Sequence, residues 1–311
     1  MTFLEHDSLV RVRSSLASRD GAPVSERHLK VKEGVYIPPR VIDYPRDDPY
    51  AHLVKVEKSA DSPDTYAFDE TYPYLDDSFR FKCNHLINDI GKWFLVSPWN
   101  RIKYGLKIQG REVLKPYRER LKDGAVCICN HVYIFDALSV CRAVRWFKRM
   151  WIPMYAKHFN GVFGWVLRYM GGIPVAENVA GMRKFNEAFD EFHRRRDWIL
   201  VFPEEVRWNY YKPIRPFRKG AFTMAYKYNV PIIPFVISYR ERKGLYRLFG
   251  KKTEPLMTLT IGEPMFPDRT RTRKEEVDGM RIRLHALMEQ MAGILENPWP
   301  AIPASETEPH A

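Results

Sequence analysis

The residues of this chain best suited to chemistry are His131 and Asp136, which lie five positions apart. An imidazole titrates near neutral pH, so it can take a proton from a substrate hydroxyl, while a carboxylate on its other nitrogen fixes the tautomer. On one continuous helix five residues turn about 500°, which would point the two side chains roughly 140° apart. They can meet only if His131 lies in a turn and Asp136 lies near the start of the following helix.

The sequence around the pair favours that arrangement. Residues 125–129, Ala-Val-Cys-Ile-Cys, are small or β-branched and apolar, which is typical of a strand covered on both faces. A polar pair follows, and residues 137–144 then repeat apolar side chains at helical spacing. Open α/β sheets bind their ligands at the carboxyl ends of such strands. Since a chain with nine histidines contains a His-x4-Asp by chance about half the time, the pair alone does not identify a function.

Strands and helices alternate along the chain from this point. We predict strands over residues 125–129, 149–157, 171–175, 198–202, 230–237 and 256–261. Besides the helix that follows Asp136, we predict helices over residues 160–170, 179–196, 218–228 and 274–295. This alternation indicates an α/β fold with a largely parallel central sheet flanked by helices.

Composition divides the chain into four segments. Residues 1–80 are rich in Pro, Asp and Ser, which predicts an irregular N-terminal extension. Residues 81–118 form an amphipathic segment, with a helix, a break at Pro98 and a short strand. Its helix is too short to span a bilayer but can lie in the membrane interface. Residues 119–297 form the main domain, and residues 298–311 form a loose tail.

The net charge of +12 predicts an anionic partner. Residues 92–104 and 146–169 interleave aromatic side chains with Lys and Arg, which suits the headgroup region of a bilayer, although platforms for single-stranded nucleic acid look similar. We favour a membrane surface as the anionic partner and do not expect the chain to bind nucleic acid. No apolar run is long enough to span a membrane and no signal core is visible, so we expect a cytoplasmic protein, peripheral on the membrane surface. Neither a metal site nor a nucleotide cofactor is predicted.

Four further segments, read in order with the first, resemble the glycerolipid acyltransferase family, the group typified by 1-acylglycerol-3-phosphate acyltransferase. The family's Asn-His-x4-Asp motif is matched from Asn130 to Asp136, and its Phe-Pro-Glu-Gly-Thr-Arg motif is approximated by residues 202–207. Its Gly-x-Ile, Phe-Lys-x-Gly-Ala and last motifs are approximated by residues 171–175, 217–221 and 230–234. The resemblance covers about residues 105–265.

The resemblance implies transfer of a fatty acyl group from acyl-CoA or an acyl-carrier protein to a lysophospholipid hydroxyl, most of all that of 1-acylglycerol-3-phosphate, in phospholipid biosynthesis. His131 would be the base and Asp136 would orient it, and the acceptor hydroxyl itself would be the nucleophile. The residues implied in acceptor binding are Glu204, Arg207 and Gly172. Those implied in phosphate or oxyanion contacts are Asn130, Arg218 and Lys219. Alternatively, Glu204 and Arg207 pair with each other.

The departures from the family pattern concern the acceptor. Members acting on lysophosphatidate often carry Asp-Arg where this chain has Ala-Glu at 176–177. Arg183 or Lys184 could compensate for the missing positive charge of that arginine. Glu-Val at 205–206 replaces Gly-Thr, and residues 208–211 add aromatic bulk. A different lipid acceptor therefore stays open, as does a lipid-binding protein that keeps the fold without activity. The alternative of a nucleic-acid-binding protein rests on the net charge alone. The Gly-x-Ser-x-Gly pattern of serine hydrolases is absent from the sequence, which argues against that class of enzyme.

Overall fold

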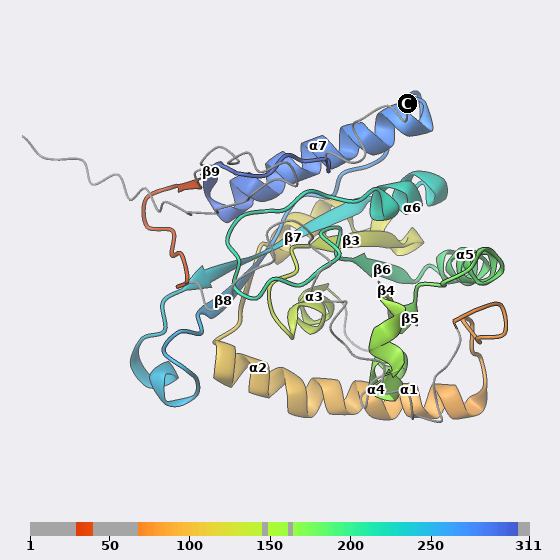
Figure 1. The fold of residues 1–311 in the computed structure, drawn as a ribbon, viewed down its shortest axis with the longest axis horizontal. Coiled ribbons are helices and arrows are strands. Elements are labelled where there is room, and N and C mark those ends of the chain that lie inside the picture. Colours follow the sequence, from red (N-terminus) through yellow and green to blue (C-terminus); the bar gives the residue numbers. More distant parts are fainter. Residues whose placement is uncertain (1–28, 40–67, 145–148, 161–163, 304–311) are drawn as a thin grey trace, which may run out of the picture.

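A seven-stranded sheet forms the centre of the computed structural model, which describes residues 29–39, 68–144, 149–160 and 164–303 (Figure 1). Most of the extension predicted over residues 1–80 and part of the aromatic stretch at 146–169 lie outside the described residues. The strand order is β2-β8-β7-β3-β6-β4-β5. Its strands are β2 (Lys107–Gln109), β3 (Ala125–Cys129), β4 (Met150–Met154), β5 (Gly172–Pro174), β6 (Trp198–Val201), β7 (Ile232–Arg240) and β8 (Leu256–Ile261).

Neighbouring strands of this sheet are parallel except for the antiparallel pair of β7 and β8. The predicted α/β fold with a largely parallel sheet is therefore confirmed. The strand predicted over residues 149–157 is too long, because the chain winds into the 3₁₀ helix η4 (Ala156–Asn160) two residues after β4 ends. The strand predicted over 230–237 is too short at its end, because β7 continues to Arg240 in its hairpin with β8.

Helices cover both faces of the sheet, as Figure 1 shows with α6 and α7 on one side and α3 on the other. Alternation along β3 explains this, since Val126 and Ile128 join the apolar cluster of α5, α6 and α7, whereas Cys127 and Cys129 join the cluster of α3. A strand that is apolar on both faces must be covered on both. The covering helices are α3 (Asp136–Val144), α5 (Val179–Arg194), α6 (Gly220–Tyr228) and α7 (Arg273–Ala292).

The last helix, α7, ends earlier than predicted. A capping box of Thr272 and Glu275 begins it, and Gly293, with a left-handed φ of 71°, ends it. Residues 294 and 295, predicted to continue the helix, instead belong to β9 (Ile294–Glu296), which pairs with β1 (Lys30–Val31). Beyond β9 the tail predicted to be loose is packed over its first residues, because the Trp299 indole donates to the Tyr211 hydroxyl at 2.9 Å.

Ahead of the sheet, α1 (Phe79–Gly91), the π-helix η1 (Lys92–Val96) and α2 (Ser97–Tyr104) follow one another as a single rod (Figure 1). The predicted break at Pro98 is wrong, because this proline lies in the first turn of α2, where its missing N–H has no role. The predicted short strand after it is β2. None of the described helices is both long enough and apolar enough to cross a membrane. The remaining elements are η2 (Arg111–Tyr117), η3 (Arg120–Asp123), α4 (Gly164–Tyr169) and η5 (Gly244–Leu248).

Candidate active site

The carboxyl end of β3 brings His131 and Asp136 together. The imidazole Nδ1 lies 2.6 Å from Asp136 Oδ2, with His131 in the turn after the strand and Asp136 at the first position of α3. The geometric expectation for this spacing is confirmed. Because an ionised carboxylate can only accept, Nδ1 carries the proton of the neutral imidazole and Nε2 is left as the acceptor. The His131 side chain is 20% exposed, whereas that of Asp136 is buried.

Backbone donors hold the Asp136 carboxylate in place. Besides His131, it accepts from the N–H of Val132 at 3.2 Å and from that of Ala137 at 2.7 Å. It also lies at the N-terminus of α3, where the helix dipole stabilises a negative charge. The turn and the first residues of α3 therefore hold the Asp136 carboxylate in one position, and the carboxylate in turn orients the His131 imidazole.

The segment after β6 completes the surroundings of His131. The Phe202 ring stacks on the imidazole, with centroids 4.2 Å apart and planes inclined by 22°. The backbone N–H of Trp208 donates to the carbonyl of His131 at 3.0 Å, and that of Tyr210 donates to the carbonyl of Val132 at 2.9 Å. The first and third motif segments thus run side by side. Phe202 opens the third motif in the sequence, but its ring contact with His131 was not predicted.

Glu204 supports the site from beneath instead of facing solvent. Its side chain is buried, with Oε2 accepting from the backbone N–H of His131 at 3.2 Å and from Arg215 Nη2 at 2.9 Å. The Arg215 backbone N–H donates to Oε1 at 3.0 Å, and the guanidinium lies 4.5 Å from the Trp208 ring centroid. The alternative of a Glu204–Arg207 pair is wrong, because the partner is Arg215. No motif indicated Arg215, and nothing in the sequence distinguishes it from the neighbouring cations Lys212 and Arg218.

Two further predicted contacts differ in the structure. Asn130 is buried, and its side-chain amide bonds both backbone groups of Ile237, donating to the carbonyl at 3.0 Å and accepting from the N–H at 2.8 Å. An oxyanion contact is not compatible with this geometry, because the amide is used to join β3 to β7. Gly172 is also buried, and a Cβ there would lie 2.8 Å from the Leu167 carbonyl oxygen, so this glycine permits close packing of α4 on β5 and does not face an acceptor.

Three of the predicted contact residues are cations in the segment after β6. Arg207 and Lys219 are exposed, and Arg218 Nε donates to Glu205 Oε2 at 3.2 Å. The sequence reasoning missed another residue at this end of the sheet, His158 of η4. Burial lowers the pKa of His158 below its ordinary value, and its electrostatic interactions with Arg207 and His131 lower it further. His158 follows the carboxyl end of β4, which lies next to β6 in the sheet, so it belongs to the same edge of the sheet as His131.

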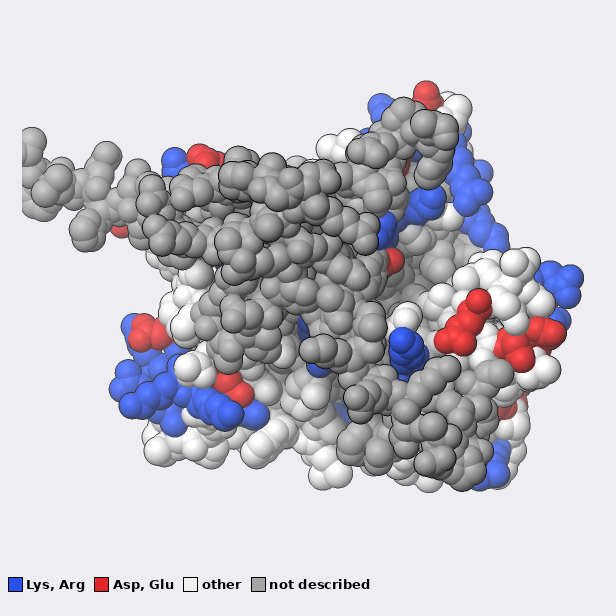
Figure 2. Space-filling model, viewed as in Figure 1, with Lys and Arg blue, Asp and Glu red and all other residues white. Residues whose placement is uncertain are grey.

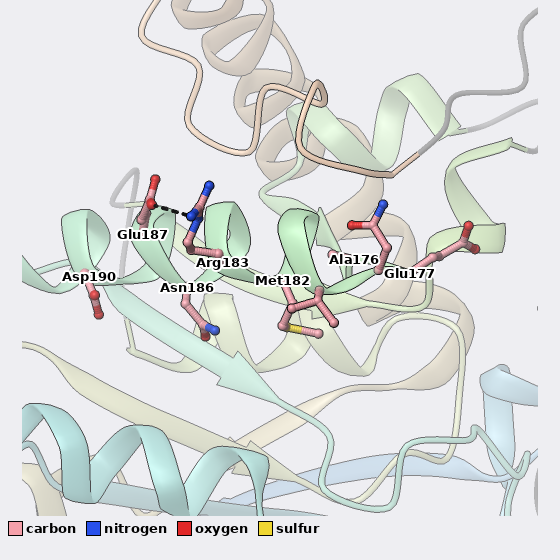
Figure 3. A pocket seen from close by; sticks show the side chains of 9 residues that line it. Ala176, Glu177, Met182, Arg183, Asn186, Glu187 and Asp190 are labelled. Atoms are coloured by element: carbon pink, nitrogen blue, oxygen red, sulfur yellow. Dashed lines mark ion pairs between the residues drawn. The ribbon is translucent and has the colours of Figure 1, made fainter.

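A groove of about 660 Å³ begins beyond β5 and follows α5. Ala176 and Glu177, the departure in the second motif, lie at one end of it (Figure 3). Figure 3 shows Arg183 beside Glu187, and the two form an ion pair at 3.9 Å, while Lys184 pairs with the same glutamate at 2.8 Å. Both cations that could compensate for the missing arginine are therefore held on the outer side of α5. Neither His131 nor Asp136 lines this groove.

Sequence comparisons agree with the arrangement of the site. A family model described as "Acyltransferase" matches residues 105–238. The 1-acyl-sn-glycerol-3-phosphate acyltransferase of Escherichia coli (strain K12) is 28% identical over 204 residues, which cover 62% of this chain and 76% of that protein. The protein of the same name from Haemophilus influenzae is 29% identical over 231 residues, covering 70% of this chain and 86% of that protein.

Among solved structures, the 1-acyl-sn-glycerophosphate acyltransferase PlsC from Thermotoga maritima superimposes with a TM-score of 0.46 at 19% identity, covering 70% of this chain and 84% of that one. The matched family model begins just before β2 and ends in β7, so it spans the sheet strands that frame His131. The motifs, their order on this sheet and the sequence matches agree. Over residues 105–238 this chain is similar to the acyltransferase family, and the relatives that match it over most of their length are glycerolipid acyltransferases.

Proposed function

We propose that this chain transfers a fatty acyl group from an acyl thioester to the free hydroxyl of 1-acylglycerol-3-phosphate. The observation that carries the proposal is the 2.6 Å contact of His131 and Asp136 at the carboxyl end of β3, which leaves Nε2 as a base. Relatives that match most of the domain are named for this acceptor. The donor, acyl-CoA or an acyl-carrier protein, supplies the thioester, and no covalent enzyme intermediate is needed.

His131 moves one proton through the reaction. Nε2 takes the proton of the acceptor hydroxyl as its oxygen attacks the thioester carbonyl, forming a C–O bond and a tetrahedral oxyanion. When this intermediate collapses, the C–S bond breaks and the thiolate leaves with the proton from the imidazolium. Asp136 stabilises the imidazolium between the two steps, as in a triad whose serine is replaced by the substrate hydroxyl.

Arg207 is the best-placed residue to hold the acceptor's phosphate. It is exposed, it follows the segment that lies beside His131, and its guanidinium can bind a phosphate through two donors. His158 adds a donor nearby. Arg218 is partly neutralised by Glu205, so we assign it a smaller share of the phosphate's charge.

The rod of α1, η1 and α2 supports a position on the surface of a membrane, and we propose the cytoplasmic surface. Its large apolar side chains are exposed at helical spacing, while its other side packs on the domain. The exposed residues are Phe79, Leu86, Ile87, Ile90, Phe94, Leu95, Trp99 and Ile102. A surface of this kind lies stably in the headgroup boundary, where a lysolipid acceptor also resides.

The test is release of free thiol from an acyl thioester in the presence of the lysolipid. We expect His131→Ala to lower kcat by about 10³-fold or more, because general base catalysis and imidazolium stabilisation are both lost. The matched control is His193→Ala, since His193 lies in the last turn of α5 and therefore at the amino edge of the sheet. This control should retain wild-type kcat.

Acceptor identity is tested in the same assay with lysolipids that differ in headgroup. We expect Arg207→Gln to raise KM for 1-acylglycerol-3-phosphate while affecting a choline-bearing lysolipid less. If the folded wild-type protein releases no thiol with any acceptor, the chain is a lipid-binding protein that keeps the fold without activity.

A further inference from the structure

The turn between β7 and β8, residues 241–255, is larger than the join of two antiparallel strands requires, and we name it the β7–β8 hairpin. It contains η5 and exposes three large apolar side chains. Leu245 and Leu248 are each 77% exposed and Phe249 is 46% exposed. Leu245 and Leu248 in particular contribute little to the core, so this apolar surface is available to a partner outside the folded chain.

Cations surround these apolar side chains. Five Lys and Arg residues and two glutamates occur in the hairpin. Glu241 pairs with Lys243 at 2.7 Å, and Glu254 pairs with Lys103 of α2 at 3.9 Å. Arg247, Lys251 and Lys252 remain as an exposed positive excess. Figure 2 shows Lys and Arg gathered at the lower left of the molecule, where Figure 1 places the hairpin.

The hairpin is fixed firmly to the end of α2. The buried Arg242 guanidinium donates to three carbonyl oxygens, those of Glu254 at 2.9 Å, Tyr246 at 2.7 Å and Lys103 at 2.8 Å. The Tyr246 ring packs directly against Gly105, which ends α2. The exposed hairpin side chains are therefore presented by a rigid base beside Trp99 and Ile102 of α2, which are also exposed.

We propose that the β7–β8 hairpin is a second membrane contact, which inserts Leu245, Leu248 and Phe249 into the interface of an anionic bilayer. Arg247, Lys251 and Lys252 then lie at the level of the lipid phosphates. The proposal rests on the interfacial position proposed above and adds a contact site separate from the rod. Together the two sites anchor the α2 end of the molecule by apolar insertion and by charge.

A bilayer fits this surface better than an acidic carrier protein does. A small acidic partner would match the cations but leave the apolar side chains of α2 in water. A bilayer covers the hairpin and the rod at once, with cations flanking apolar side chains as interfacial anchors do.

The experiment measures sedimentation of the full chain with vesicles of phosphatidylglycerol and phosphatidylcholine. We expect Leu245→Glu with Leu248→Glu to lower the partition coefficient at least tenfold. Lys251→Gln with Lys252→Gln should lower it about fivefold per lysine on the anionic vesicles, and much less on pure phosphatidylcholine. The control is Ile282→Glu, a change of the same kind at an exposed position of α7. It should leave binding unchanged.

The proposed membrane contact of the hairpin and the proposed activity are tested by separate measurements. Thiol release with a short-chain, monomeric lysolipid reports the active site without a membrane, and we expect all three variants to retain it. Wild-type vesicle binding by both hairpin variants would overturn the proposal while leaving the activity intact. Unchanged vesicle binding with a lower rate for acyl-carrier protein but not for acyl-CoA would also overturn it, in favour of a donor site. The lysine variant changes only exposed side chains and so guards against misfolding.

Discussion

Beneath His131, the buried pair of Glu204 and Arg215 is the contact whose loss should affect the site most. Removing one partner of a buried pair leaves an uncompensated charge, at a cost of about 3–5 kcal/mol. We therefore predict that Arg215→Met destabilises the protein by about that amount and lowers kcat more than it changes KM, because the His131 backbone loses a fixed acceptor.

The double variant Glu204→Gln with Arg215→Met separates charge from packing. Since it removes both charges, we expect it to recover most of the lost stability, as measured by urea unfolding at neutral pH. If the losses of unfolding free energy in the two single variants simply add in the double variant, the two side chains are not coupled and the prediction is wrong. Arg215→Lys, which keeps the charge, should retain more activity than Arg215→Met.

At the next position along the chain, Glu205 occupies a backbone conformation that favours glycine. Its φ is 60°, and the family has glycine at this position. A side chain in the left-handed region costs about 1 kcal/mol relative to glycine. Both Glu205→Gly and Glu205→Ala remove the pairing with Arg218, so a comparison of the two isolates the backbone effect.

We predict that Glu205→Gly is more stable than Glu205→Ala by about 1 kcal/mol, measured by thermal or urea unfolding. In ordinary backbone the order would be reversed, because glycine loses more conformational entropy on folding. An alanine variant at least as stable as the glycine variant would show that residue 205 does not hold a left-handed conformation.

Among the elements, α1 depends on a buried polar cluster where it meets the domain. His85 Nδ1 lies 2.7 Å from the Tyr169 carbonyl, and Asp89 is held by Lys92 on its other side. Burial lowers the pKa of His85 below its ordinary value, with Arg149 and Lys92 adding to the effect, while Asp89 and the Tyr169 carbonyl oppose it. The folded protein therefore favours the neutral imidazole.

The sign of the resulting pH dependence follows from linkage. Below the ordinary pKa of about 6.5, the unfolded chain binds the proton that the folded chain resists. The stabilisation by neutral His85 is thus fully present above that pH and is lost as the pH falls. We predict that acidification lowers the amide protection factors of residues 79–104, taken relative to the intrinsic exchange rate at each pH, and that His85→Gln, which cannot titrate, weakens this pH dependence. An unchanged dependence in the variant would assign it to another group.

At the scale of the whole molecule, parallel strands bring separated segments to one edge. β3, β6, β4 and β5 are neighbours in the sheet, so their carboxyl ends place His131, Phe202, His158 and the start of the α5 groove along a single line. The rod and α3 lie on one side of the sheet, and α6 and α7 lie on the other (Figure 1). The net charge of +12 is consistent with an anionic surface as the partner, although charge alone does not identify a membrane.

Local patterns in the sequence are enough to predict the strands and helices that frame the site, because strand alternation and helical spacing depend only on neighbouring residues. They also predict the His131–Asp136 contact, since a strand, a turn and a helix start leave five residues few other ways to arrange themselves. The end of α7 was missed because Gly293 adopts a left-handed conformation, which a run of helical spacing does not reveal.

The side chains that support the site are fixed by contacts between distant segments. Arg215 as the partner of Glu204, Ile237 as the partner of Asn130 and the packing role of Gly172 all depend on which strand lies beside which. Such contacts join residues that are distant in the sequence, and their choice follows from the order of strands in the sheet. The placement of the β7–β8 hairpin beside α2 is of the same kind, because Arg242 and Lys103 are separated by 139 residues.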